Sequence, residues 1–134
     1  MREVGRVRSH RDLEVYTLAF ESAMEIFEMS KGFPSEERYS LTDQVRRSSR
    51  AVCANLTEAW RHRRYEGNFL LRLNDAEAEA AETQTWLEFA SACKYIDLKS
   101  KMALSTKYDH IIGKLVTMIN HPEKWIIGER GTRG

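Results

Sequence analysis

The strongest constraint on the fold is a repeating spacing in the stretch from Glu37 to Trp60. Six residues on one helical face follow one another at alternating gaps of four and three: Leu41, Val45, Ser48, Val52, Asn55 and Ala59. This spacing is typical of a helix that packs lengthwise against other helices. Ser48 and Asn55 are polar, and a buried polar group without a partner costs about 1–3 kcal/mol. We therefore expect Asn55 to hydrogen-bond to a neighbouring helix, at Thr83 or Gln84.

Helix-breaking residues divide the chain into four helical segments. Only Gly67 and Gly113 interrupt the sequence between Pro34 and Pro122. The expected helices cover residues 12–32, 35–63, 69–95, and the segment from the turn at 97 to 120. Because no strand pattern occurs, we predict an all-α, antiparallel up-down-up-down four-helix bundle. It should form a single domain over residues 1–127, followed by a disordered tail over residues 128–134.

Each of the other three segments also has an apolar face. The face of the first segment contains Leu13, Tyr16, Phe20, Ala23 and Phe27, and is widened by Met24 and Ile26. The face of the third segment contains Leu73, Ala76, Ala80, Thr83, Leu87 and Ala90. The face of the fourth segment contains Leu104, Tyr108, Ile111, Leu115 and Met118. Gly113 lies inside the fourth segment and costs about 1 kcal/mol relative to Ala, so we expect a close helix crossing there. Trp86 and Phe89 widen the apolar surface of the third segment, which predicts that they lie at a self-association interface.

Composition describes a cytoplasmic domain without a membrane segment. The first residues lack the apolar core of a secretory signal, and no stretch approaches the roughly 18 apolar residues of a membrane span. Cys53 and Cys93 have no metal-type or redox-type spacing and are expected to be buried thiols. The formal net charge is only +1, so any nucleic acid must be met by a local patch.

Charge is segregated along the chain. Residues 38–64 contain seven arginines and two acids, a net charge of +5, whereas residues 65–90 contain six acids and one arginine, a net charge of −5. Three interpretations remain open. The two helices neutralise each other within one chain, the basic face of one subunit meets the acidic face of the next, or the basic face stays available for phosphates.

The third interpretation makes six arginines the candidate nucleic-acid-binding residues: Arg46, Arg47, Arg50, Arg61, Arg63 and Arg64. Aromatic residues lie next to the last three in the sequence. Trp60 precedes them, and Tyr65 and Phe69 follow them. Such aromatic residues either stack on nucleobases or close the end of a bundle beneath the arginine side chains.

The sequence lacks the residues that helical enzymes need, so we expect no catalytic residue, metal or cofactor. None of the four histidines has a glutamate three positions before it, as a di-iron bundle requires. Glu58 and His62 lie on one helical face but cannot complete a metal site alone. There is no glycine-rich phosphate loop, and no serine or cysteine has the partners of a catalytic triad.

Two blocks of sequence resemble a known family. The first contains Glu37-Arg38-Tyr39, Leu41-Thr42, Gln44, Arg46-Arg47, Ala54-Asn55 and Glu58, and the second contains Glu79, Glu82-Thr83-Gln84-Thr85-Trp86-Leu87, Ala90 and Tyr95. They resemble the four-helix-bundle proteins encoded by intervening sequences within bacterial 23S rRNA genes, over roughly residues 10–120. The resemblance implies a cytosolic, non-enzymatic bundle that forms a homopentamer. It also implies kinship with accessory proteins of diversity-generating retroelements, which engage a reverse transcriptase and nucleic acid.

Overall fold

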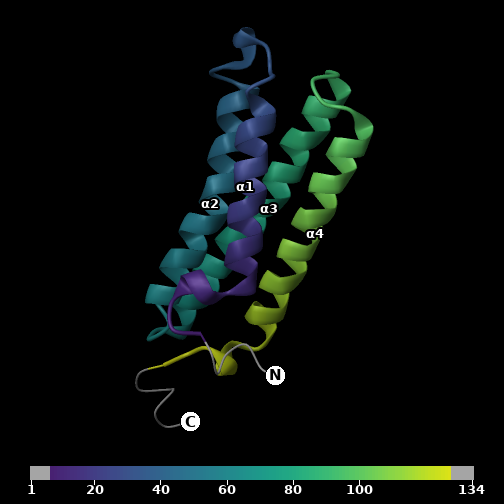
Figure 1. Ribbon diagram of the computed structural model, residues 1–134. Helices are drawn as coiled ribbons and strands as arrows, with labels where there is room; N and C mark the ends of the chain where they lie inside the picture. Colours follow the sequence, from purple (N-terminus) through teal and green to yellow (C-terminus); the bar gives the residue numbers. More distant parts are fainter. Residues whose placement is uncertain (1–6, 128–134) are drawn as a thin grey trace.

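The computed structural model describes residues 7–127 and contains four long helices (Figure 1). They are α1 (Glu14–Ser30), α2 (Leu41–Arg61), α3 (Glu66–Ala92) and α4 (Leu98–Asn120), with short 3-10 turns η2 (His10–Asp12), η3 (Ser35–Glu37) and η4 (Pro122–Lys124). The all-α prediction is confirmed, because no strand occurs in the described part of the chain. The tail predicted to be disordered, residues 128–134, lies outside the described residues.

The four helices form a bundle in which each helix packs against two others. α2 contacts α1 and α3, and α4 contacts α3 and α1. Successive helices run in opposite directions, as the colours in Figure 1 show. The ion pairs agree, since Glu14 and Glu25 of α1 pair with Lys114 and Lys107 of α4, in reverse order along the two helices.

All four helices contribute buried residues to one core. All six predicted face residues of α3 and all five of α4 are buried, including Tyr108, whose phenol is fully inaccessible. Among the described side-chain atoms, the Tyr108 hydroxyl and the Ser22 hydroxyl are buried without a hydrogen-bond partner. Burial also raises the pKa of Tyr108 well above that of an exposed tyrosine.

The buried polar contact between α2 and α3 involves Ser48, and the prediction for Asn55 was wrong. The hydroxyl groups of Ser48 and Thr83 lie 2.8 Å apart and share a hydrogen bond. Asn55 is only half-buried and donates to the carbonyl of Ala51 in its own helix. The spacing predicted Asn55 on the buried face of α2, but the neighbouring Leu56 is the fully buried residue. The buried face of α2 is therefore displaced by one residue from the predicted one at this position.

The predicted inner face of α1 was right only in part, because Leu13, Ala23 and Ile26 are buried whereas Tyr16 and Phe27 are half-buried. The residues that α1 buries are mostly small, namely Val15, Ala19, Ser22, Ala23, Ile26 and Ser30. Phe20 and Met24 are instead 50% and 46% exposed. α1 therefore has two apolar stripes, and spacing alone does not distinguish which of them faces the core.

The connection before α2 differs from the predicted helix start at Ser35. Residues Ser35–Glu37 form a 3-10 turn, and α2 begins only at Leu41. The Glu37 carboxylate accepts hydrogen bonds from the Leu41 amide at 3.2 Å, the Ser40 hydroxyl at 2.6 Å and the Tyr95 hydroxyl at 2.9 Å. The Glu37 side chain thus provides an acceptor for one free amide in the first turn of α2 and connects this turn to the end of α3.

Candidate functional site

The six candidate arginines lie in three different surroundings. Arg47 faces α3, where its guanidinium contacts the carboxylates of Glu82 at 2.5 Å and Glu79 at 3.5 Å. A second pair, Arg72 with Glu58 at 3.3 Å, joins the same two helices with the charges reversed. Arg47 is therefore neutralised within its own chain. This agrees with the first of the three interpretations of the charge pattern.

Arg46 and Arg50 lie on the other side of α2, against α1. The guanidinium of Arg46 donates to the Ser30 hydroxyl at 2.7 Å and to the Phe27 carbonyl at 3.3 Å. Both guanidinium groups lie over the Phe27 ring, at 4.7 Å and 5.7 Å from its centroid. Arg46 thus connects two helices, whereas Arg50 stays exposed beside the ring.

The end of α2 carries the other three arginines. Arg63 is half-buried, and its guanidinium lies over the Trp60 ring, 3.5 Å from the ring centroid. Of the two interpretations of the aromatic residues, Trp60 therefore fits the one in which the ring closes the end of the bundle beneath an arginine side chain. The pKa of Arg63 is lowered by burial and by the charge of Arg61. Arg61 and Arg64 are exposed, and no carboxylate within residues 7–127 lies within ion-pair distance of either.

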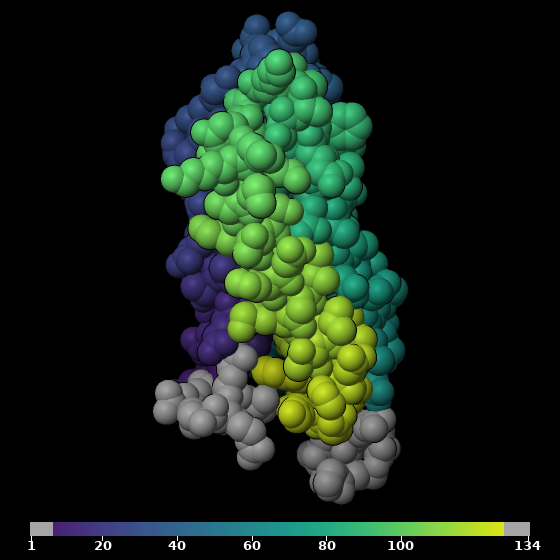
Figure 2. Space-filling model, turned by 90° about the vertical axis from the view of Figure 1, so that its right-hand side faces the viewer, coloured from purple at the N-terminus to yellow at the C-terminus, as the bar shows by residue number. Residues whose placement is uncertain are grey.

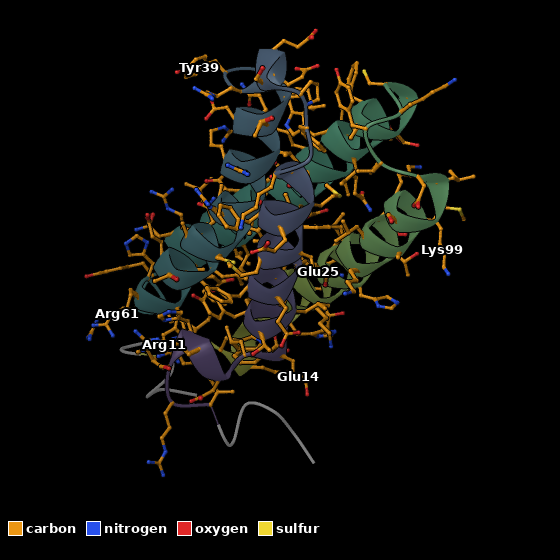
Figure 3. All side chains as sticks on the ribbon, turned by 45° about the horizontal axis from the view of Figure 1, so that its top comes forward. Arg11, Glu14, Glu25, Tyr39, Arg61 and Lys99 are labelled. Carbon is orange, nitrogen blue, oxygen red and sulfur yellow. The ribbon has the colours of Figure 1, made fainter. Side chains whose placement is uncertain are left out.

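The turn η2 brings further positive charge to the same end. Figure 3 shows Arg11 and Arg61 close together at one end of the bundle. The pKa of His10 is lowered by burial and then by the charges of Arg11 and Arg61, which places both guanidinium groups near the imidazole. We call Arg11, Arg61 and Arg64 the basic end. The sequence pattern missed Arg11, because it lies 50 residues away from Arg61 along the chain.

Helix charge alternates around the bundle. The net charges are −4 for α1, +2 for α2, −5 for α3 and +3 for α4. Each helix therefore packs between two helices of opposite sign, and the cross-helix pairs of Arg47, Lys107 and Lys114 follow this pattern. Exposed pairs stabilise weakly, by about 0–1 kcal/mol each, but their arrangement favours this order of helices over others.

Trp86 and Phe89, the predicted interface residues, lie on the α2 side of α3. Phe89 is 53% exposed, and the Trp86 indole lies 5.9 Å from it, centroid to centroid. The indole N–H donates to Glu82 at 3.0 Å. With Tyr39 and Leu41 these rings line a surface hollow of about 360 Å³, whose edge carries Cys93.

The described residues contain no group of three histidine, cysteine or acidic side chains that could hold a metal ion. The prediction of two buried thiols was half wrong. Cys53 is half-buried, and burial raises the pKa of its thiol to about 11, whereas Cys93 is exposed. Across residues 7–127 no helix is long and apolar enough to cross a membrane.

Comparison with known proteins agrees with this architecture. A solved structure from Bacteroides thetaiotaomicron VPI-5482, described as a protein of unknown function from the S23 ribosomal protein family, matches with a TM-score of 0.73 and 27% identity. The match covers 79% of this chain and 95% of that chain. No curated protein matches. The family described as 23S rRNA-intervening sequence protein matches residues 11–117, most of the chain. The chain therefore belongs to the family of 23S rRNA-intervening sequence proteins.

Proposed function

We propose that this protein is a non-enzymatic helical scaffold that self-associates and holds nucleic acid weakly, without sequence preference, at the basic end. One observation carries the proposal. Arg61 and Arg64 are exposed and unpaired by any carboxylate in the described residues, whereas Arg47 is neutralised by α3. Exposed arginines without a carboxylate partner remain available to bind phosphates.

The geometry favours contacts to phosphates over contacts to bases. Trp60 is buried beneath Arg63 and offers no ring face to a base. Tyr65 is 61% exposed beside Arg64 and supports at most one stacking contact. Phosphate contacts position a nucleic acid but do not read its sequence.

Self-association would make such a weak site effective. The net charge of the whole chain is +1, so long-range attraction to nucleic acid is slight. An oligomer repeats the basic end once per subunit, and linked weak sites bind more tightly than one site alone. The resemblance noted above implies five subunits.

The test is a salt titration of binding to single-stranded RNA and to duplex DNA, followed by fluorescence anisotropy. Arg61→Gln/Arg64→Gln should weaken binding and lower the salt slope by about one for each phosphate that the variant no longer neutralises. Arg47→Gln/Arg50→Gln is the matched control, because it removes the same net charge from α2 and should change binding much less. An equal weakening in both variants, or binding that resists salt, would contradict the proposal.

A second candidate function is the binding of a protein partner, such as the reverse transcriptase that the resemblance implies. The exposed Phe89, the half-buried Trp86 beside it and their hollow favour this alternative, since aromatic residues are enriched in protein interfaces. Phe89→Ser should then abolish binding of a purified reverse transcriptase from a diversity-generating retroelement, while binding to RNA stays unchanged.

A further inference from the structure

Five serine and threonine side chains are buried in the described part of the chain, and four of them have a hydrogen-bond partner. Ser30 and Ser49 each donate to a backbone carbonyl of their own helix, and Ser48 and Thr83 share a hydrogen bond. Ser22 on the inner face of α1 is the exception, because its hydroxyl is buried without a partner among residues 7–127. Such a group is unusual, since it gives up its bonds to solvent and gains none in return.

The hydroxyl of Tyr108 on α4 is in the same situation. Figure 2 looks onto the outer side of α4, and Tyr108 lies on the opposite side of that helix, with no exposed surface. Its hydroxyl also has no hydrogen-bond partner in the described residues. Buried tyrosine hydroxyls normally have one, as the Tyr95 hydroxyl does with Glu37. The core therefore contains two hydroxyl groups that are free to bind a small polar ligand.

An ion pair between α1 and α4 places Ser22 and Tyr108 at nearly the same height in the bundle. Glu25 of α1 pairs with Lys107 of α4. Ser22 precedes Glu25 by less than one helical turn, and Tyr108 directly follows Lys107. Because α1 and α4 run in opposite directions, these two steps lead the same way along the bundle. Both residues are buried, so their side chains point into the core from neighbouring helices at one level.

The electrostatics of Tyr108 agree with this placement. The pKa of Tyr108 is raised by burial first, and then by Cys53 of α2 and by Glu25, which places both of these groups near the phenol. Burial raises the pKa of the Cys53 thiol to about 11. The thiol is therefore protonated at neutral pH and can donate a weak hydrogen bond. Three helices thus bring polar groups to the same level of the core.

We propose that one water molecule is bound in the core between α1 and α4, where it bridges the hydroxyl groups of Ser22 and Tyr108. A buried water typically makes two to four hydrogen bonds to polar groups that otherwise lack partners. Each hydroxyl can donate one hydrogen bond and accept others, which matches the donors and acceptors of water. The residues beside Ser22 on the inner face, Ala19 and Ala23, are small and do not cover its hydroxyl with a long side chain.

Water fits these groups better than an ion does. Both hydroxyl groups are neutral, and Glu25, the nearest acidic residue on α1, already pairs with Lys107. The described residues also contain no group of three histidine, cysteine or acidic side chains that could hold a metal ion. The inference depends neither on self-association nor on binding of nucleic acid, and the experiment can be done on the protein in any oligomeric state.

The first measurement counts long-lived internal waters by oxygen-17 relaxation dispersion of the solvent, which does not respond to exchange of hydroxyl protons. The wild-type protein should hold one more such water than Ser22→Ala or Tyr108→Phe. Ser49→Ala is the matched control, because Ser49 is a buried serine whose hydroxyl is bonded within its own helix. Its count should equal that of the wild type. Each of these substitutions removes a single oxygen atom, and circular dichroism checks that the helices remain.

The second measurement is a double-mutant cycle by urea unfolding. Ser22→Ala and Tyr108→Phe should each lower the equilibrium constant for folding, by about tenfold, because each leaves the other hydroxyl with an incomplete set of hydrogen bonds. The double variant should lose much less than the product of the two effects, since the first substitution already breaks the bridge. Two hydroxyl groups that truly lack a partner give the opposite result, because removing either one then leaves stability unchanged or raises it.

The combined outcomes decide between three arrangements. Loss of one water together with non-additive losses of stability supports the bridge. Non-additive losses with an unchanged water count show that the two hydroxyls bond to each other directly, and this overturns the proposal. Variants that keep the wild-type count and are as stable as the wild type, or more stable, overturn it as well. Either single variant is sufficient for the water count if the other one does not fold.

Discussion

At the residue scale, Glu37 shows how a sequence motif acts through structure. It opens the Glu37-Arg38-Tyr39 block, and its half-buried side chain accepts three hydrogen bonds. These bonds hold the loop after α1, the start of α2 and the end of α3 together. Tyr39, in contrast, is 86% exposed and contributes little to the fold.

The hydrogen bonds to Glu37 predict an acid-sensitive contribution to stability. They lower the pKa of Glu37, with the Ser40 hydroxyl as the main cause and Tyr95 second. Because the folded pKa lies below the unfolded value, this stabilisation is present above the unfolded pKa of about 4.3 and is lost as the pH falls through the folded pKa. Between neutral and acidic pH, the urea midpoint of Glu37→Gln should therefore fall less than that of the wild-type protein. Glu36→Gln is the control and should behave like the wild-type protein.

The hydrogen bond between Tyr95 and Glu37 also predicts a change in stability at alkaline pH. This hydrogen bond is the main reason that the pKa of Tyr95 is raised to about 12. The sign is opposite to that of Glu37. The Tyr95 contribution is complete below the unfolded pKa of about 10 and is lost as the pH rises through about 12. In Glu37→Gln, ultraviolet titration of the phenols should show one tyrosine ionising at lower pH, and an unchanged titration would contradict the contact.

At the element scale, helix faces were predictable where a helix has one continuous apolar stripe. The faces of α3 and α4 were predicted residue by residue, because small or branched residues recur there at regular gaps. α1 was mispredicted at Phe20 and Met24, because these large apolar residues are exposed while smaller residues of the same helix are buried. A single chain offers no signal that distinguishes a stripe buried by its own fold from one that another molecule covers.

Gly113 was predicted to mark a close helix crossing, and the structure contradicts this within one chain. A Cβ atom added at Gly113 would meet no heavy atom within 4 Å. The glycine therefore costs helix stability without a packing reason in the subunit. Gly113→Ala should raise the free energy of unfolding of the subunit by about 0.5–1 kcal/mol, measured by urea denaturation. Ala103→Gly, at another exposed position of α4, should lower it by a similar amount.

At the scale of the whole molecule, the sequence located the basic residues but not their surroundings. Arg46, Arg47 and Arg50 lie within two turns of one helix and were predicted together as nucleic-acid-binding residues. In the fold Arg47 turns toward α3 and Arg46 toward α1, because adjacent residues on a helix point about 100° apart. The basic end combines residues far apart in the sequence, so only the tertiary structure reveals it.

The proposed function predicts that self-association and nucleic-acid binding are coupled, and the exposed residues Phe20 and Met24 of α1 test this coupling without altering the basic end. Phe20→Ser/Met24→Ser leaves Arg61 and Arg64 in place but should reduce the number of basic ends that one particle presents. RNA binding by this variant should weaken by on the order of tenfold or more, with a smaller salt slope, because each binding event neutralises fewer phosphates. Phe89→Ser should bind RNA like the wild type. If the Phe20→Ser/Met24→Ser protein is monomeric yet binds RNA with the wild-type affinity and salt slope, one basic end suffices and the oligomer serves another purpose.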